Sequence, residues 1–87
     1  MNKVQLTKEG FDNLKHELNQ LIKVKRPYAV KRLHNARSMG DLKENSEYAS
    51  AKEDLAFVEG RIAEIEAMLK NAVVVKPTNN NNEIVLG

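Results

Sequence analysis

The stretch YASAKEDLAFVEGRIAEIEAMLKNA, residues 48–72, decides the fold of this chain because its apolar residues keep a heptad spacing. Steps of three and four residues separate the members of this seam, which are Tyr48, Ala51, Leu55, Val58, Ile62, Ile65, Leu69 and Ala72. A seam kept over more than three heptads is typical of a helix in a coiled coil. The stretch therefore predicts a long helix that packs against a second helix.

The N-terminal half of the chain supplies a partner helix. Thr7 is a good N-cap residue, and a proline inside the helical pattern, Pro27, predicts a bend because it removes one backbone hydrogen bond. Gly40 is expected to end this helix as its C′ residue. The apolar stripe between these points changes phase near Pro27 and consists of Phe11, Leu14, Leu18, Leu21, Ile22, Ala29, Val30, Leu33 and Ala36.

The two seams fit each other if the chain folds back on itself. In an antiparallel hairpin, residues at equal height have a constant sum of sequence numbers. The sum is 84 for Ala36 with Tyr48, Leu33 with Ala51, Ala29 with Leu55 and Ile22 with Ile62, and 83 for Leu18 with Ile65, Leu14 with Leu69 and Phe11 with Ala72. The sequence thus predicts an all-α fold, a long antiparallel two-helix coiled-coil hairpin over residues 1–73 with its tip at about 38–47. A monomer is favoured over a dimer through the same seams.

The C-terminal residues 74–87 have a different character. Three β-branched valines end at Pro77, and the polar run TNNNN, residues 78–82, separates them from EIVLG, residues 83–87. Two short strand-like pieces do not form a stable sheet alone. We therefore expect a β-prone linker and the opening of a second domain that is otherwise absent.

Composition excludes several classes of protein. The 87 residues contain no cysteine, no tryptophan and four aromatic residues, which argues against a disulfide framework, a thiolate zinc site and a deep aromatic pocket. The sequence has no apolar run of the roughly 20 residues that a membrane span needs. We expect a cytoplasmic protein with no membrane partner.

Charge is unevenly distributed although the net charge is only +2. Residues 18–40 contain no acid but six bases, and acids dominate from Asp41 to Asp54. One interpretation of the acids is helix capping, with Asp41 and Glu44 as a capping box and Ser46 as a cap one turn later. The other is metal binding, because Mg²⁺ is commonly held by one or two carboxylates together with water and substrate phosphates. A basic arm that holds a phosphate backbone fits the second interpretation.

The residues around the predicted tip carry a resemblance to a known family. The motifs are LTKEGFDNLKHEL at 6–18, KRPYAVKRLHNARSMGDLKENSEYASAKED at 25–54 and VEGRIAEIEAMLKNAVVV at 58–75. With these motifs the chain resembles the N-terminal coiled-coil domain of the Gre transcript cleavage factors, most closely the GreA type. The pattern ARxxGDLxENxEYxxAKE in the second motif is far more specific than a generic helical hairpin.

The resemblance implies a function and a set of site residues. Members of the family insert the coiled coil into the secondary channel of bacterial RNA polymerase. They are not enzymes, but they stimulate the polymerase to cleave the 3′ end of backtracked nascent RNA, which rescues arrested complexes. The family's catalytic acids match Asp41 and Glu44, which help to hold the second Mg²⁺ ion of the polymerase active site; the free protein is not expected to bind this ion tightly. The RNA-contacting basic residues match Arg37 and Lys52, and an FKBP-like second domain is expected to begin near Val74.

Two other functions remain open. A secondary-channel regulator that inhibits the polymerase without cleavage would have the same shape but altered chemistry at the tip. A plain coiled-coil interaction module would need the seams and not the tip. The pair Asp41 and Glu44 favours the cleavage factor over both.

Overall fold

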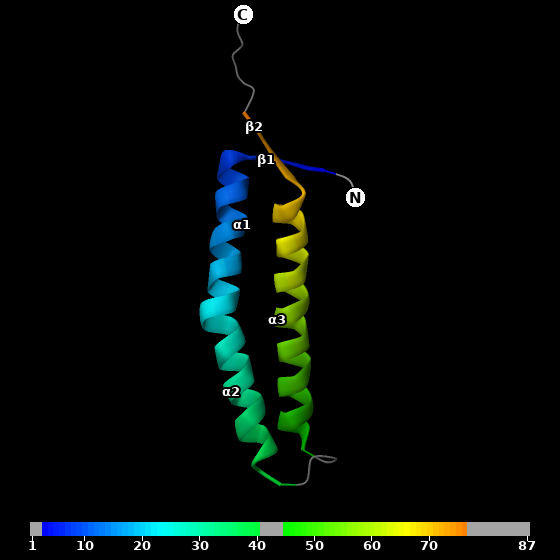
Figure 1. The fold of residues 1–87 in the computed structure, drawn as a ribbon. Helices are drawn as coiled ribbons and strands as arrows, with labels where there is room; N and C mark the ends of the chain where they lie inside the picture. Colours follow the sequence, from blue (N-terminus) through cyan, green and yellow to red (C-terminus); the bar gives the residue numbers. More distant parts are fainter. Residues whose placement is uncertain (1–2, 41–44, 77–87) are drawn as a thin grey trace, which may run out of the picture.

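The computed structural model describes residues 3–40 and 45–76. The elements are β1 (Val4–Thr7), α1 (Lys8–Gln20), the π-helix η1 (Leu21–Lys25), α2 (Arg26–Arg37), α3 (Ser46–Lys70) and β2 (Ala72–Val75). Figure 1 shows that α1, η1 and α2 form one continuous arm that runs antiparallel to α3. The predicted helical hairpin is therefore confirmed. We call the end that carries β1 and β2 the base, and the end where α2 finishes and α3 starts the tip.

The first arm begins as predicted but ends earlier. The Thr7 hydroxyl accepts a hydrogen bond from the Gly10 amide at 3.0 Å, so Thr7 is the N-cap of α1. At the other end Ser38 is the C-cap of α2, and Gly40 lies two residues beyond it with a φ of 114°. The expectation that Gly40 is the C′ residue is therefore wrong by one position. A glycine is still favoured there, because other residues rarely adopt a positive φ.

The change of phase in the first arm is a π-helical turn. The Arg26 amide donates to the Leu21 carbonyl five residues back, which widens the helix and takes up one extra residue. One residue is also the difference between the two register sums of the hairpin. Leu21 is consequently buried at 5% exposure while Ile22 is 37% exposed, so the expected pairing of Ile22 with Ile62 is wrong.

Pro27 lies just after this π-helix, within the first turn of α2. Proline has no amide hydrogen, so Pro27 cannot make a backward hydrogen bond like the one that the Arg26 amide makes to the Leu21 carbonyl. The irregularity that the sequence placed at Pro27 is thus found in the five residues before Arg26. Val30, which the sequence placed on the stripe, is exposed for the same reason of helical phase.

The core changes composition along the hairpin. Leu21, Val58, Ile62 and Ile65 form a buried cluster, against which Leu14, Leu18, Met68 and Leu69 pack. Toward the tip the buried residues are small, namely Ala29, Ala36 and Ala51. The members of the predicted α3 seam are all buried or half-buried.

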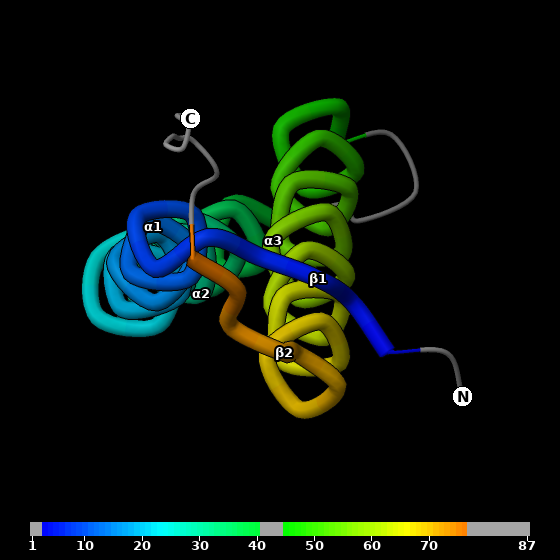
Figure 2. The backbone as a smooth tube through the Cα atoms, turned by 90° about the horizontal axis from the view of Figure 1, so that it is seen from above, coloured from blue at the N-terminus to red at the C-terminus, as the bar shows by residue number. Residues whose placement is uncertain are grey.

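A two-stranded parallel sheet closes the base. Val4 pairs with Ala72 and Thr7 with Val75, and the Val4 amide donates to the Asn71 carbonyl at 2.8 Å. Figure 2 shows β1 and β2 side by side across the ends of the two arms. Strand β1 was not predicted from the sequence, and the two strand-like pieces judged unstable alone were the valines 73–75 and residues 83–87. The pair of β1 and β2 forms because each strand continues directly from a packed helix, which lowers the entropic cost of bringing the strands together.

The described residues reach only part of the predicted C-terminal segment. β2 crosses the predicted domain boundary between residues 73 and 74. The polar run 78–82 and the predicted strand 83–87 lie outside the described residues. The domain boundary and the second domain therefore stay predictions.

Candidate nucleic-acid interface at the tip

The two acids expected to carry the chemistry, Asp41 and Glu44, lie outside the described residues. The structure does describe the ends of α2 and α3 that flank these acids in the sequence. Arg37 is the last residue of α2, and Lys52 lies in the second turn of α3. The candidate interface is therefore built from the ends of these two helices.

One side chain links the two helix ends. The Asn45 Oδ1 atom accepts a hydrogen bond from the Tyr48 amide at 3.0 Å, which makes Asn45 the N-cap of α3. The Nδ2 atom of the same side chain donates to the Ala36 carbonyl, in the last turns of α2, at 2.7 Å. The expectation that Asp41 or Ser46 caps α3 is thus wrong. The signal was present, since asparagine is among the best N-cap residues.

Arg32 forms a polar cluster between α2 and the first turns of α3. Its Nε atom donates to Glu47 Oε2 at 2.6 Å, and Nη2 donates to Glu47 Oε1 at 3.1 Å. Nη2 also donates to the Ser50 hydroxyl at 2.9 Å, and Nη1 pairs with the Asp54 carboxylate. The hydrogen bonds from Arg32 lower the pKa of Glu47, and those to Glu47 and Asp54 raise the pKa of Arg32.

This cluster removes Arg32 from the expected basic patch. Arg32 is one of the six bases in residues 18–40, the arm expected to hold a phosphate backbone, and its sequence number adds to 84 with that of Lys52, which places the two at equal height. A sum of sequence numbers gives height along the hairpin but not direction around the helix. Glu47 and Asp54 on α3 neutralise Arg32, so Arg32 offers no free charge to RNA.

Arg37 and Lys52 remain available to a ligand. Both residues are exposed, and neither takes part in an ion pair within the described residues. The Lys52 ammonium lies 5.6 Å from the centroid of the Tyr48 ring, a distance that permits a cation–π interaction. Tyr48 itself is half-buried on the α3 seam, as expected of a packing residue.

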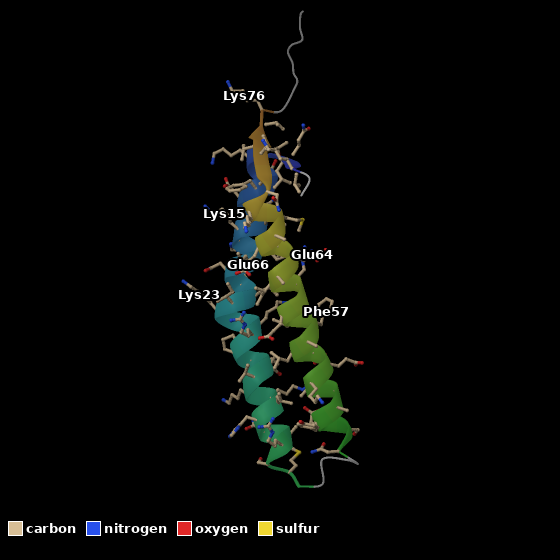
Figure 3. The ribbon with its side chains drawn as sticks, turned by 45° about the vertical axis from the view of Figure 1, so that its right-hand side comes forward. Lys15, Lys23, Phe57, Glu64, Glu66 and Lys76 are labelled. Carbon is tan, nitrogen blue, oxygen red and sulfur yellow. The ribbon has the colours of Figure 1, made fainter. Side chains whose placement is uncertain are left out.

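The rest of the basic arm is partly neutralised as well. Arg26 Nε lies 3.7 Å from Glu59 Oε2 on α3, whereas Lys23, Lys25 and Lys31 are exposed. Figure 3 shows Lys23 pointing away from the hairpin into solvent. Among the described residues of this arm and the tip, the cations that could face a polyanion are therefore the exposed lysines together with Arg37 and Lys52.

An apolar hollow between the arms was not predicted. It measures about 490 Å³, and the exposed side chains of Val24, Tyr28 and Phe57 are among those that line it. Figure 3 shows Phe57 projecting outward from α3. Beside the hollow, Arg61 donates to both carboxylate oxygens of Glu17 at 2.7 and 2.9 Å, which lowers the pKa of Glu17. The signal in the sequence was three large apolar residues off the heptad seam.

Two negative findings concern the described residues only. Within 3–40 and 45–76, no group of three or more histidine, cysteine, aspartate or glutamate side chains could hold a metal ion. The expected metal site at Asp41 and Glu44 stays a prediction. No helix among these residues is both long enough and apolar enough to cross a membrane.

Comparison with known proteins gives consistent matches. Residues 4–74 match the family described as "Transcription elongation factor, N-terminal", of GreA and GreB. Transcription elongation factor GreA of Staphylococcus saprophyticus is 51% identical over 82 residues, and GreA of Staphylococcus aureus strain JH9 is 48% identical over 82 residues. Each alignment covers 94% of this chain and 52% of the relative. The chain therefore spans about half the length of the curated relatives that it matches.

Proposed function

Since the chain belongs to the family of N-terminal domains of GreA- and GreB-type transcription elongation factors, we propose that it acts on bacterial RNA polymerase and stimulates cleavage of backtracked RNA. In this proposal the hairpin enters the secondary channel of the polymerase with its tip first. The protein catalyses no reaction itself. It adds side chains to an active site that already hydrolyses the RNA, and so returns arrested complexes to elongation.

The observation that supports this proposal most is the form of the hairpin. The two packed arms end at the tip, where the described residues 36–40 and 45–53 lie, while both described chain ends lie at the base (Figure 1). The 25 residues of α3, at about 1.5 Å per residue, span roughly 38 Å. An arm of this length presents the tip motif well away from the base, as insertion into a channel requires.

The roles of the tip residues follow from their chemistry. Asp41 and Glu44 would hold the second Mg²⁺ of the polymerase active site, and when bound this ion stabilises developing charge and lowers the pKa of a coordinated water. Carboxylate oxygens are the ligands that Mg²⁺ prefers, so the two side chains fit the ion chemically. Arg37 and Lys52, exposed and without an ion pair in the described part of the chain, would contact the RNA phosphates near the 3′ end.

The proposal extends to the partners and the surroundings. The protein acts in the cytoplasm as a monomer, with the polymerase and the 3′ end of the nascent RNA as partners. The segment 74–87 leads into an FKBP-like domain that adds to docking on the polymerase. There are two alternatives, a regulator that blocks the channel without cleavage and a plain coiled-coil module. The following experiment separates them from the proposed function.

The decisive experiment measures release of the RNA 3′ end from a backtracked polymerase complex. We expect the double variant Asp41→Ala with Glu44→Ala to lose stimulated cleavage and to fall to the rate of the polymerase alone. A matched control is Glu53→Ala with Glu66→Ala, which removes the same charge from two exposed positions on α3. The control is expected to cleave as the unaltered chain does.

Each outcome of this experiment selects one function. Undiminished cleavage by the Asp41 and Glu44 variant contradicts the metal-lending mechanism. Slower nucleotide addition without any cleavage by the unaltered chain identifies an inhibitory regulator. If no form of the chain affects the polymerase, the plain coiled-coil interaction module is the function that remains.

A second measurement tests the contact with RNA. We expect Arg37→Ala to weaken crosslinking of the chain to the RNA 3′ end, because a guanidinium that binds phosphate is lost. Lys52→Ala is expected to act in the same direction. Lys15→Ala, an exposed lysine on α1, serves as the control. Unchanged crosslinking would remove Arg37 from the RNA contacts.

A further inference from the structure

The tip is held together by two polar links that the family comparison does not assign. In the first, Asn45 bonds to the Tyr48 amide at 3.0 Å and to the Ala36 carbonyl at 2.7 Å, so one side chain joins the start of α3 to the last turns of α2. In the second, Arg32 joins α2 to Glu47 and Asp54 on α3. Both links fix the relative position of the two helix ends.

The buried residues beneath these links are small. Ala36 is 1% exposed and Ala51 is 0% exposed, so each of these helices buries only a methyl group at these positions. Close packing of small residues has no preferred register of its own, because alanine side chains do not interlock as longer side chains do. The directional hydrogen bonds of Asn45 therefore help to fix the register of α2 against α3 at the tip. The Asn45 side chain is partly buried, which strengthens both bonds relative to bonds in water.

Asp41 and Glu44 lie in the sequence between Arg37, the last residue of α2, and Asn45, the N-cap of α3. The distance between the two ends of any connection limits the conformations that the connection can adopt. Catalytic groups must be placed closely, since a misplacement of about 1 Å can lower a rate by about a hundredfold. A residue that sets the separation of the ends therefore controls the placement of groups on the connection.

We propose that Asn45 is a positioning residue for transcript cleavage, because its link from the α3 N-terminus to the Ala36 carbonyl sets the geometry in which the tip acids are presented. This proposal rests on the proposed function. It concerns the amide donor of Asn45 rather than the capping acceptor. Serine and aspartate could cap α3 equally well, but neither carries an amide that could donate to Ala36.

One substitution separates the two bonds of this side chain. Asn45→Asp keeps an oxygen that accepts from the Tyr48 amide, so α3 remains capped. It also places a second carboxylate oxygen against the Ala36 carbonyl in place of the donor, which turns an attraction into a repulsion. Asn71→Asp is the matched control. Asn71 Nδ2 donates to the Ala67 carbonyl at 2.8 Å at the base, so an equivalent donor is lost far from the tip.

The first readout is cleavage of backtracked RNA at increasing concentrations of the chain. For Asn45→Asp we expect the maximal rate to fall about tenfold or more, with an unchanged concentration for half-maximal stimulation. Asn71→Asp is expected to keep the maximal rate. Wild-type cleavage by Asn45→Asp, a change confined to the half-maximal concentration, or an equal fall with Asn71→Asp would each overturn the proposal.

The second readout is independent of the polymerase. The chain contains no cysteine, so spin labels can be attached at Met39→Cys and Glu53→Cys, two exposed positions on either side of the tip. We expect Asn45→Asp to shift or broaden the distance distribution between these labels. Labels at Lys15→Cys and Glu66→Cys, nearer the base, are expected to keep theirs. An unchanged distribution at the tip contradicts the proposed link.

The assay also distinguishes failure of this proposal from failure of the proposed function. If the Asp41 and Glu44 double variant is inactive while Asn45→Asp is fully active, only the positioning role is wrong. If the double variant retains full cleavage, the proposed function is wrong, and the positioning role is wrong with it.

Discussion

The base and the tip of the same hairpin are held together in different ways. Toward the base, large aliphatic side chains such as Leu18, Ile65 and Leu69 pack between the arms, and a short parallel sheet closes the end. At the tip, the buried residues are alanines, and hydrogen bonds from Asn45 and Arg32 connect the helices. The base therefore depends mainly on apolar burial, which is not directional, whereas the tip depends on close approach and directional bonds.

The π-helix η1 separates these two regions. It takes up one residue, so the base and the tip can each keep a packed register although the register differs by one. A continuous α-helix with the same sequence would rotate one region out of contact with α3. The difference teaches that one simple hairpin can combine a region held by apolar burial with a tip whose geometry depends on directional bonds.

The largest expected effect comes from removing a core side chain at the base. Ile65 is 0% exposed, so Ile65→Ala should lower the free energy of unfolding by about 2–5 kcal/mol through lost burial and a residual cavity. Urea unfolding followed by circular dichroism measures this change. Glu66→Ala, an exposed neighbour, should stay within about 0.5 kcal/mol. If Ile65→Ala does not fold, Ile65→Val should cost about 0.5–1.5 kcal/mol, and no loss in either variant would contradict an apolar base.

An intermediate effect is expected from overfilling the tip. Ala51 is completely buried, so Ala51→Leu should push α2 and α3 apart and cost about 1–3 kcal/mol. The rate of stimulated cleavage should also fall under conditions in which the variant is fully folded, because the altered region carries the tip residues. Ala49→Leu places the same side chain on an exposed position of α3 and should change little. Equal behaviour of the two variants would show that the helices do not approach closely at the tip.

The smallest expected effect is a dependence of stability on pH. Hydrogen bonds from Arg61 and Arg32 lower the pKa of Glu17 and Glu47 from the ordinary value of 4.5. Both pairs therefore contribute stability above about pH 4.5, and this contribution is lost as the pH falls through the lowered pKa values. The effect should be small because both pairs are open to solvent.

Thermal unfolding at pH values from about 2 to about 7 measures this dependence, because the two carboxylates lose their charge within this range. Glu47→Gln and Glu17→Gln should each reduce the loss of stability below about pH 4.5, because each variant lacks one of the two carboxylates. Glu47 lies near the tip and Glu17 lies nearer the base. Glu66→Gln is the control, since Glu66 is exposed and belongs to neither cluster. A profile that rises toward low pH would contradict both ion pairs.

Much of the fold could be predicted from local patterns. The α3 seam, the Thr7 cap and the antiparallel pairing follow from residue spacing and from one good capping residue. The strand β1 could not be predicted, because four residues carry too little pattern and their pairing with β2 depends on where two helices end. In the sequence the π-helix was visible only as a change of phase of the apolar stripe. This change was assigned to Pro27 and not to the five residues before Arg26.

The candidate site was predicted less completely. Family motifs identified Asp41, Glu44, Arg37 and Lys52, and the structure shows the latter two exposed at the tip. Nothing in the spacing showed that Arg32 is neutralised by Glu47 and Asp54 rather than available to RNA. Asn45 was overlooked because Asp41 and Glu44 offered a more familiar capping pattern.

The sequence by itself determined that this chain is an antiparallel helical hairpin, because heptad spacing along both arms allows one efficient way to bury the apolar residues. Only the tertiary structure decided which polar groups are committed to the fold and which remain free. That choice depends on direction around each helix and on the one-residue shift at η1, which bring Asn45 to the Ala36 carbonyl and Arg32 to the acids of α3. Pairing across two helices is a property of their contact, and no single stretch of sequence contains it.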